Sequence, residues 1–172
     1  RGIAANFGVI DAYGGAAYYE TGYYHHVKFD ATDSLTAPDG FLIRTNHSVT
    51  QKRDNGYGYI RAMATRRVFD EQLLKTGTLS LDCLLETATR NLMHGLTQND
   101  LRKLPLPAHR HDETMLPFHD YVVKEITASV MIVQGVRPGE APALTTAWTI
   151  PGWPLASVAV PLWTAAGPNL PT

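Results

Sequence analysis

Cysteine is nearly absent from this 172-residue sequence, and that absence sets the first limit on the fold. A single residue, Cys83, cannot form a disulfide within the chain, so no disulfide framework organises it. Long apolar runs are missing too, since no segment approaches the roughly 18 consecutive apolar residues of a membrane span. Neither sign of charge is in excess, because the sequence has 15 Lys and Arg and 16 Asp and Glu, and the basic residues form no stripe. We therefore expect neither nucleic acid nor a membrane among the partners.

The motifs of a self-contained catalytic site are also missing. No serine lies in a G-x-S-x-G elbow, and Gly14-Gly15 falls in an expected hairpin rather than between a strand and a helix, which excludes a phosphate loop. Cys83 falls in an expected helix beside leucines, where burial would raise the pKa of the thiol and block access to it. We interpret it as a small core residue. Any chemistry is therefore expected to need residues from another polypeptide segment.

The first residue is Arg1, with neither an initiator methionine nor a signal peptide before it. We interpret this start as that of an excised fragment, a processed product or one piece of a longer gene product. The composition suits an ordinary globular domain, because 44% of the residues are apolar and 18% are charged, enough to bury a core. We expect residues 1–172 to form a single domain.

The first fifty residues show the pattern of an antiparallel sheet. Short apolar and aromatic stretches are separated by glycine-containing turns, of which Tyr13-Gly14-Gly15 is the clearest. The expected strands are Asn6–Asp11, Ala16–Glu20, Tyr23–Phe29 and Phe41–Thr45. Because the turns are short, neighbouring strands should pair in antiparallel fashion.

Two helices are expected in the middle of the chain. Apolar residues at 3.6-residue spacing predict one helix after Asn55-Gly56, and Thr76-Gly77 should end it. A stripe that runs from Leu81 to Leu92 predicts a second helix, with Gly95 just beyond its end.

The last third returns to the pattern of strands. A loop rich in Pro and His covers Leu104–Asp120, and strands are expected at Thr127–Val133, Ala143–Ile150 and Ala156–Val160. The tail from Ala165 to Thr172 is expected to be peripheral. Strands, then helices, then strands again predict an α+β fold with helices packed on one side of its sheet layers.

Histidines suggest one weak metal hypothesis. His109 and His111, with Asp112 and His119, have suitable ligand types, but their spacing matches no strong zinc pattern. We favour a polar surface loop as the interpretation of these residues. His25-His26 should point to opposite faces of a strand and cannot easily share a metal.

One segment is a positive candidate for chemistry. Arg44-Thr45-Asn46-His47 closes an expected strand, a place where a rigid scaffold can present polar groups. The amide of Asn46 could donate a hydrogen bond to a developing oxyanion. On spacing alone, an asparagine that initiates a turn is the favoured interpretation.

A resemblance gives the Asn46 segment more weight. The runs Asn6-Phe-Gly-Val-Ile-Asp11, Gly14-Gly15-Ala-Ala-Tyr-Tyr-Glu20 and Phe41-Leu-Ile-Arg-Thr-Asn46-His47 resemble the N-terminal nucleophile (Ntn) hydrolases. The branch is that of acyl-CoA:6-aminopenicillanate acyltransferase and the linear amide hydrolases. The stretches Ala143–Ile150 and Val158–Trp163 look like bacterial members of the same group, so the likeness spans most of the chain.

The resemblance implies the later portion of an αββα Ntn sandwich that another segment completes. Family members act on linear, non-peptide C–N amide bonds with a cysteine that autoproteolytic processing frees at a chain terminus. The α-amine of that cysteine is the base, so no cofactor is implied. Asn46 matches the asparagine of the family's oxyanion hole, and no catalytic role is carried over to Arg44, Thr45 or His47.

This sequence departs from the family pattern in lacking the nucleophile. It belongs to a segment upstream of the matched run, and Cys83 does not match it. The resemblance therefore implies a heterodimer with an upstream Cys-bearing segment or subunit of the same gene product, and a small-molecule amide or acyl substrate. It also implies a secreted or periplasmic hydrolase or acyltransferase. The alternative is a non-catalytic structural or assembly protein that retains the fold without the nucleophile.

Overall fold

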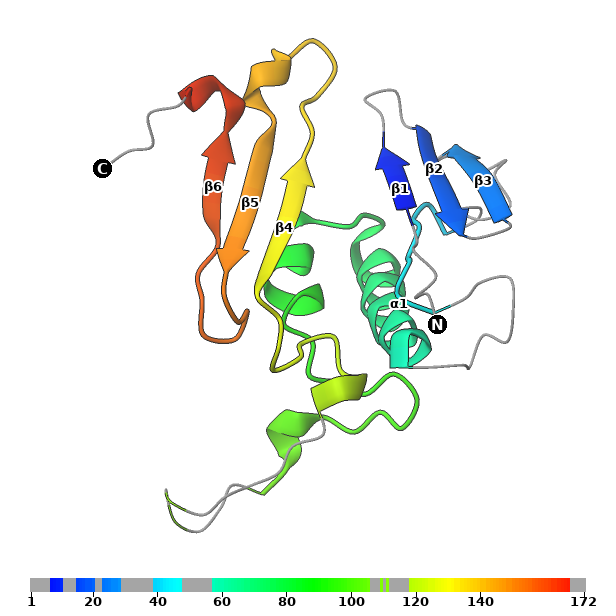
Figure 1. Cartoon of the computed structure of the whole chain (residues 1–172), viewed down its shortest axis with the longest axis vertical. Coiled ribbons are helices and arrows are strands. Elements are labelled where there is room, and N and C mark those ends of the chain that lie inside the picture. The colour runs from blue at the N-terminus through cyan, green and yellow to red at the C-terminus, as the bar shows by residue number, and fades with distance from the viewer. Residues whose placement is uncertain are drawn as a thin grey trace. The chain divides into compact units, whose positions relative to one another are not determined.

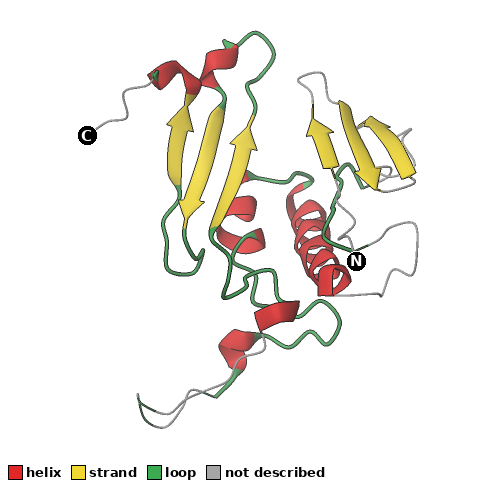
Figure 2. Cartoon of the chain, viewed as in Figure 1, coloured by secondary structure: helices red, strands yellow, loops and turns green. Residues whose placement is uncertain are grey.

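The structure is a computed structural model that describes residues 7–10, 15–20, 23–28, 39–47, 57–105, 109, 111 and 118–167. The chain divides into two compact units, unit 1 at Arg1–Ala62 and unit 2 at Met63–Thr172, and each is described by itself. Both helices and antiparallel sheets are present, so the chain is an α+β protein (Figures 1 and 2). The expectation of a single domain over residues 1–172 stays a prediction.

Unit 1 contains a three-stranded antiparallel sheet in the order β1-β2-β3. Its strands are Phe7–Ile10 (β1), Gly15–Glu20 (β2) and Tyr23–Lys28 (β3). Phe7 lies opposite Tyr19 in the register. The predicted hairpin and the third strand are therefore confirmed, while the turn residues 11–14 and 21–22 lie outside the described residues.

The predicted strand Phe41–Thr45 is wrong. These residues are assigned to no strand, although Phe41 is buried with 6% of its surface exposed. Their hydrogen bonds go elsewhere: the hydroxyl of Thr45 donates to the carbonyl oxygen of Gly58 at 2.6 Å, and the carbonyl of Thr45 accepts from the N–H of His47 at 2.8 Å. The apolar run therefore signalled burial, and not pairing in a sheet.

The first predicted helix is confirmed as α1, Tyr57–Thr76, whose residues belong in part to each unit. Its end follows from Gly77, which has a φ of +72° and donates its N–H to the carbonyl of Leu73 at 2.8 Å. Glycine adopts this left-handed conformation without a steric penalty, which explains why the helix ends there. No helix among the described residues is both long and apolar enough to span a membrane.

The second predicted helix is shorter than its leucine stripe indicated. Leu81 and Asp82 are α-helical, and the helix continues as a π-helix, Cys83–Ala88 (η1). The prediction that it reaches Leu92 is wrong. The N–H of Thr89 donates to the carbonyl of Leu84, five residues back, which is the π-helical bond. Beyond Ala88 the next carbonyl in the series, that of Leu85, accepts from the hydroxyl of Thr89 and from Nε of Arg90, and the carbonyl of Leu92 accepts from the N–H of Leu101.

The sheet of unit 2 is antiparallel with the order β4-β5-β6. Its strands are Ser129–Gln134 (β4), Thr146–Pro151 (β5) and Val160–Trp163 (β6). The strands predicted at Thr127–Val133 and Ala143–Ile150 are confirmed, but both begin later than predicted. The second begins at Thr146 because Pro142–Leu144 forms a 3-10 turn.

The strand predicted at Ala156–Val160 is wrong, because β6 begins only at Val160. The chain before it forms a turn in which Ala156 donates its N–H to Trp153, and the carbonyls of Pro154 and Ser157 accept from the guanidinium of Arg90. Backbone groups bound to a side chain are not available to a sheet ladder.

Three further 3-10 turns complete the described structure, at Leu101–Lys103, Phe118–Asp120 and Thr164–Ala166. Most of the predicted loop at Leu104–Asp120, and residues 168–172 of the predicted tail, lie outside the described residues.

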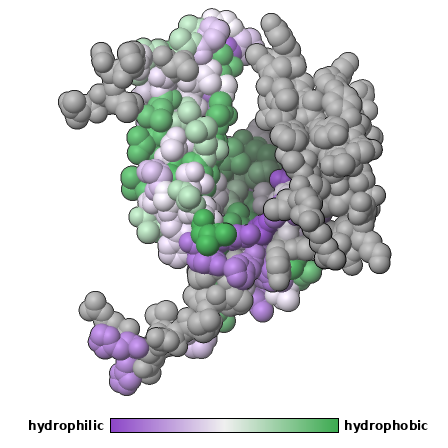
Figure 3. Space-filling model, in the orientation of Figure 1, coloured by the Kyte–Doolittle hydropathy of each residue, from purple (hydrophilic) through white to green (hydrophobic). Residues whose placement is uncertain are grey.

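The two faces of the β4–β6 sheet differ in burial. On one face Val130 lies opposite the fully buried Ile150, and Val130 and Ile132 share a pocket with residues of α1 and η1. On the other face Met131 and Val133 are exposed. Figure 3 shows apolar residues gathered over this sheet. Among the described residues, the core of unit 2 therefore lies on one side of its sheet.

Candidate functional site

Asn46 lies at the apex of a tight turn in unit 1. The N–H of His47 donates to the carbonyl of Thr45 at 2.8 Å, so the residues 45–47 form a γ-turn with Asn46 at its centre. The side chain of Asn46 is exposed. The turn thus presents an amide outward on a short, constrained piece of backbone.

Gly58, in the first turn of α1, holds that backbone in place. A Cβ atom at this position would lie 2.7 Å from the carbonyl carbon of Asn46 and 2.8 Å from the backbone nitrogen of His47. Both neighbours are backbone atoms, so they cannot rotate away as a side chain would. Only glycine permits such a close approach of the helix to the turn.

A chain of hydrogen bonds reinforces this contact. The hydroxyl of Thr45 lies 2.6 Å from the carbonyl oxygen of Gly58 and 2.7 Å from Nδ1 of His47. Since a carbonyl can only accept, the single hydroxyl proton goes to Gly58, and Nδ1–H of His47 donates to Thr45. This assigns the Nδ1–H tautomer to a neutral His47, whose ring packs edge-on against Tyr59 with centroids 5.8 Å apart.

Arg61 orients the amide of Asn46. Its guanidinium donates to Oδ1 of Asn46 from the next turn of the helix. An amide whose oxygen is held in this way presents its NH₂ group, the donor, away from the arginine. A positioned NH₂ group is the type of donor that stabilises charge on an oxyanion. By contrast, Arg44 donates to the carbonyl of its neighbour Ile43 at 2.8 Å, within its own segment.

The sequence predicted Asn46 as the candidate donor but missed Gly58, Tyr59 and Arg61. The contacts with Gly58 and Arg61 join residues 13 and 15 positions apart, and no periodic pattern reports such pairs. The only available signal was the run Gly58-Tyr-Ile-Arg61 at the start of an expected helix.

Cys83 lies in the core of unit 2, where burial raises the pKa of its thiol. The expectation of a buried residue with a raised pKa is confirmed. A protonated, buried thiol is a poor nucleophile.

No cluster of three metal-ligating side chains is found among the described residues. His109 and His111 are exposed, His119 lies 3.2 Å from a carboxylate oxygen of Glu125, and Asp112 is outside the described residues.

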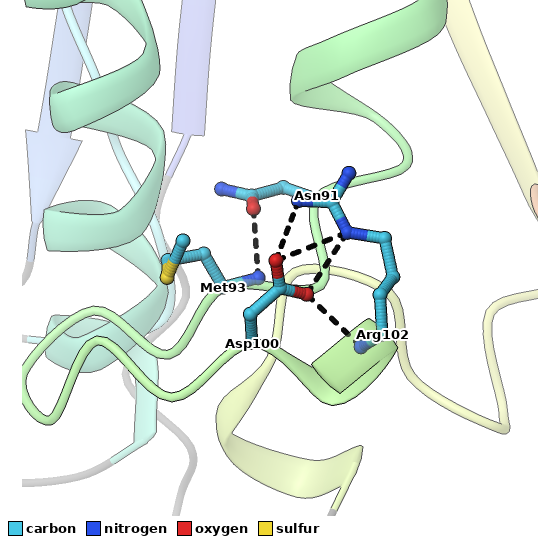
Figure 4. A network of polar contacts seen from close by, with 4 residues as sticks. All are labelled: Asn91, Met93, Asp100 and Arg102. Carbon is cyan, nitrogen blue, oxygen red and sulfur yellow. Dashed lines mark hydrogen bonds and ion pairs between the residues drawn. The ribbon is translucent and has the colours of Figure 1, made fainter. Parts of the chain in front are cut away.

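A second polar cluster lies in unit 2 and consists of Asn91, Met93, Asp100 and Arg102 (Figure 4). The carboxylate of Asp100 accepts from the backbone N–H of Arg102 at 3.0 Å and from two nitrogens of its guanidinium. The hydrogen bonds from Arg102 hold the pKa of Asp100 below its ordinary value, against the opposing effect of burial. Beside them, Oδ1 of Asn91 accepts from the N–H of Met93 at 2.8 Å. All these bonds join residues of the segment 91–102, so the cluster stabilises the loop after η1.

Comparison with known proteins finds no family model, no curated protein and no solved structure that matches this chain.

Proposed function

We propose that this chain is the later portion of a cysteine Ntn amidohydrolase or acyltransferase that acts on linear, non-peptide C–N amide bonds. The observation that carries the proposal is the geometry at Asn46, where Arg61 holds the amide oxygen and Gly58 holds the backbone. An exposed amide held by two independent contacts is preorganised to donate a hydrogen bond.

In this proposal the nucleophile belongs to an upstream Cys-bearing segment of the same gene product. Its thiolate attacks the carbonyl carbon of the amide, and the α-amine of the same cysteine takes up the thiol proton. Negative charge then develops on the carbonyl oxygen, and the NH₂ group of Asn46 donates to it. Collapse of the intermediate breaks the C–N bond, the α-ammonium group returns its proton to the leaving nitrogen so that a neutral amine departs, and the acyl-enzyme that remains is resolved by water or a second amine. The chemistry requires no cofactor.

The proposal includes the completed αββα sandwich and a processed heterodimer in a secreted or periplasmic location. The resemblance in sequence supports these parts, and the exposed apolar face of the β4–β6 sheet is compatible with a partly assembled sandwich.

The companion segment is tested by mass spectrometry under denaturing conditions on natively purified protein. We expect a second polypeptide, beginning with Cys, in equal amount. Protein that has the mass of this chain alone and hydrolyses no amide would favour the structural or assembly role instead.

The role of Asn46 is tested by Asn46→Ala in the protein purified with its companion, assayed on chromogenic anilides of several acyl groups. Loss of one oxyanion donor should lower kcat by about 10²- to 10³-fold. The melting temperature should change little, because Asn46 is exposed. Asn99→Ala, another exposed asparagine, is the matched control and should retain full activity. An unchanged kcat in Asn46→Ala would remove Asn46 from the mechanism.

A further inference from the structure

Unit 2 contains a pocket of about 280 Å³ between its helical segments and its sheet. Phe69 of α1, Leu84 and Ala88 of η1, and Val130 and Ile132 of β4 are among the ten residues that line it. The pocket therefore lies on the buried side of the sheet, where three separate elements contribute side chains.

No charged residue lines the pocket, and its polar groups are largely engaged. The hydroxyl of Thr89 donates to the carbonyl of Leu85 at 2.9 Å, and that of Thr127 accepts from the N–H of Lys124 at 3.2 Å. These threonines can therefore offer their methyl groups to the interior. A lining of this kind does not provide the two to four polar partners that an ordered water needs, and it favours an apolar occupant.

The volume defines the size of that occupant. An engineered apolar cavity of about 150 Å³ binds benzene, which has six carbon atoms, so a pocket of nearly twice that volume accommodates roughly ten carbons. We propose that the unit 2 pocket binds the hydrocarbon chain of a single-chain amphiphile, with about ten carbons inside and the polar head in solvent. This binding site is independent of the chemistry proposed at Asn46, and either can fail without the other.

The test titrates the purified protein with decanoate and with decan-1-ol, followed by methyl NMR and by calorimetry. We expect the methyl signals of Val130, Ile132 and Leu84 to shift on binding, and those of Val133, on the opposite face of the same strand, to stay in place. Butyrate should bind at least tenfold more weakly than decanoate. The alcohol and the acid should bind within about tenfold of each other, because the lining carries no charge to select a head group.

Two pairs of variants separate the pocket from the rest of the surface. Ala88→Leu places three more carbons in the pocket and should weaken binding of decanoate at least tenfold, while Thr87→Leu, at the exposed neighbouring position, should not. Ile132→Ala enlarges the pocket and should shift the preferred chain roughly three carbons longer, while Val133→Ala should not. Circular dichroism checks that each variant is folded.

Absence of binding in the folded protein would overturn the proposal. So would binding that leaves the methyl signals of Val130 and Ile132 unchanged or that is insensitive to both Ala88→Leu and Ile132→Ala, since the chain would then bind elsewhere.

Discussion

Gly58 is the residue on which the geometry of the Asn46 turn depends most directly. Two effects of Gly58→Ala oppose each other. Alanine favours a helix over glycine by up to about 1 kcal/mol, but crowding of backbone against a new methyl group costs about 1–3 kcal/mol. Because the contacts would be 2.7–2.9 Å, we expect crowding to win and Gly58→Ala to lower the free energy of unfolding by about 1–2 kcal/mol. Urea denaturation measures this change.

The control for Gly58→Ala is Gly135→Ala, where an added Cβ meets no atom within 4 Å. That variant should be neutral or slightly stabilising, because alanine restricts the unfolded chain. If Gly58→Ala proves as neutral as the control, the turn at Asn46 is not tightly held, and the preorganised amide loses its structural basis.

Asp100 makes stability depend on pH in the acid range. Its side chain is 6% exposed and pairs with Arg102, and its pKa in the folded chain lies below the ordinary 3.8. A carboxyl with a lowered folded pKa contributes stability that is fully present above its unfolded pKa and is lost as the pH falls through the folded value. We therefore expect the free energy of unfolding to fall below about pH 4, partly because of this residue.

Asp100→Asn should remove that contribution and, at pH 7, cost about 1 kcal/mol through loss of the charged acceptor for the guanidinium of Arg102, while the asparagine can still cap the turn at Leu101–Lys103. Urea denaturation at pH 7 and pH 3, with Asp82→Asn at an exposed position for comparison, measures both effects. Equal acid sensitivity of the wild type and Asp100→Asn would show that the ion pair does not stabilise the fold.

At the scale of elements, sequence patterns that depend on residues close together in the chain predicted helices and strands correctly. The hairpin of β1 and β2, helix α1 and strands β4 and β5 all follow from turn residues or from periodic apolar residues. The errors fall where a segment makes hydrogen bonds with a partner distant in the sequence. Gly58 accepts the Thr45 hydroxyl, and Arg90 binds carbonyls more than sixty positions away, so the residues near them form loops. One-dimensional periodicity has no means of reporting such partners.

Arg90 joins η1 to the loop before β6. Its Nε donates to the carbonyl of Leu85 at 3.1 Å, and its two terminal nitrogens donate to Pro154 and Ser157. Hydrogen bonds from a charged group to partly buried carbonyls are worth about 1.5–3 kcal/mol each, and their loss is not additive. We expect Arg90→Met to lower the free energy of unfolding by about 2–4 kcal/mol.

Arg90→Lys should recover only part of that loss, because an ammonium group cannot reproduce the planar fork of the guanidinium. Arg137→Met, at an exposed turn position, is the control and should change stability by no more than about 0.5 kcal/mol. Chemical denaturation compares the three variants. An effect of Arg90→Met no larger than that of the control would mean that the loop before β6 is held by its other contacts.

At the scale of the whole molecule, the uncovered face of the β4–β6 sheet is the feature with the widest consequence. Met131 and Val133 are 66% and 63% exposed, and Val133 aligns through Ala147 with Leu162, which is also exposed. A contiguous apolar face of this kind favours association with another surface. We expect the chain by itself to associate with increasing concentration, and the double variant Val133→Lys/Leu162→Lys to weaken that association at least tenfold in sedimentation equilibrium.

The same double variant should keep the fold, because lysines on a solvent-facing sheet surface cost at most about 1 kcal/mol each in strand propensity. Ile132→Lys, one position away on the buried face, is the matched contrast. It places a charge among the apolar residues of the pocket and should unfold unit 2 or nearly so. If instead Val133→Lys/Leu162→Lys were as destabilising as Ile132→Lys, the exposed face of the sheet would be covered in solution by other residues of this chain. The surface that packs against it would then belong to the same polypeptide and not to a companion.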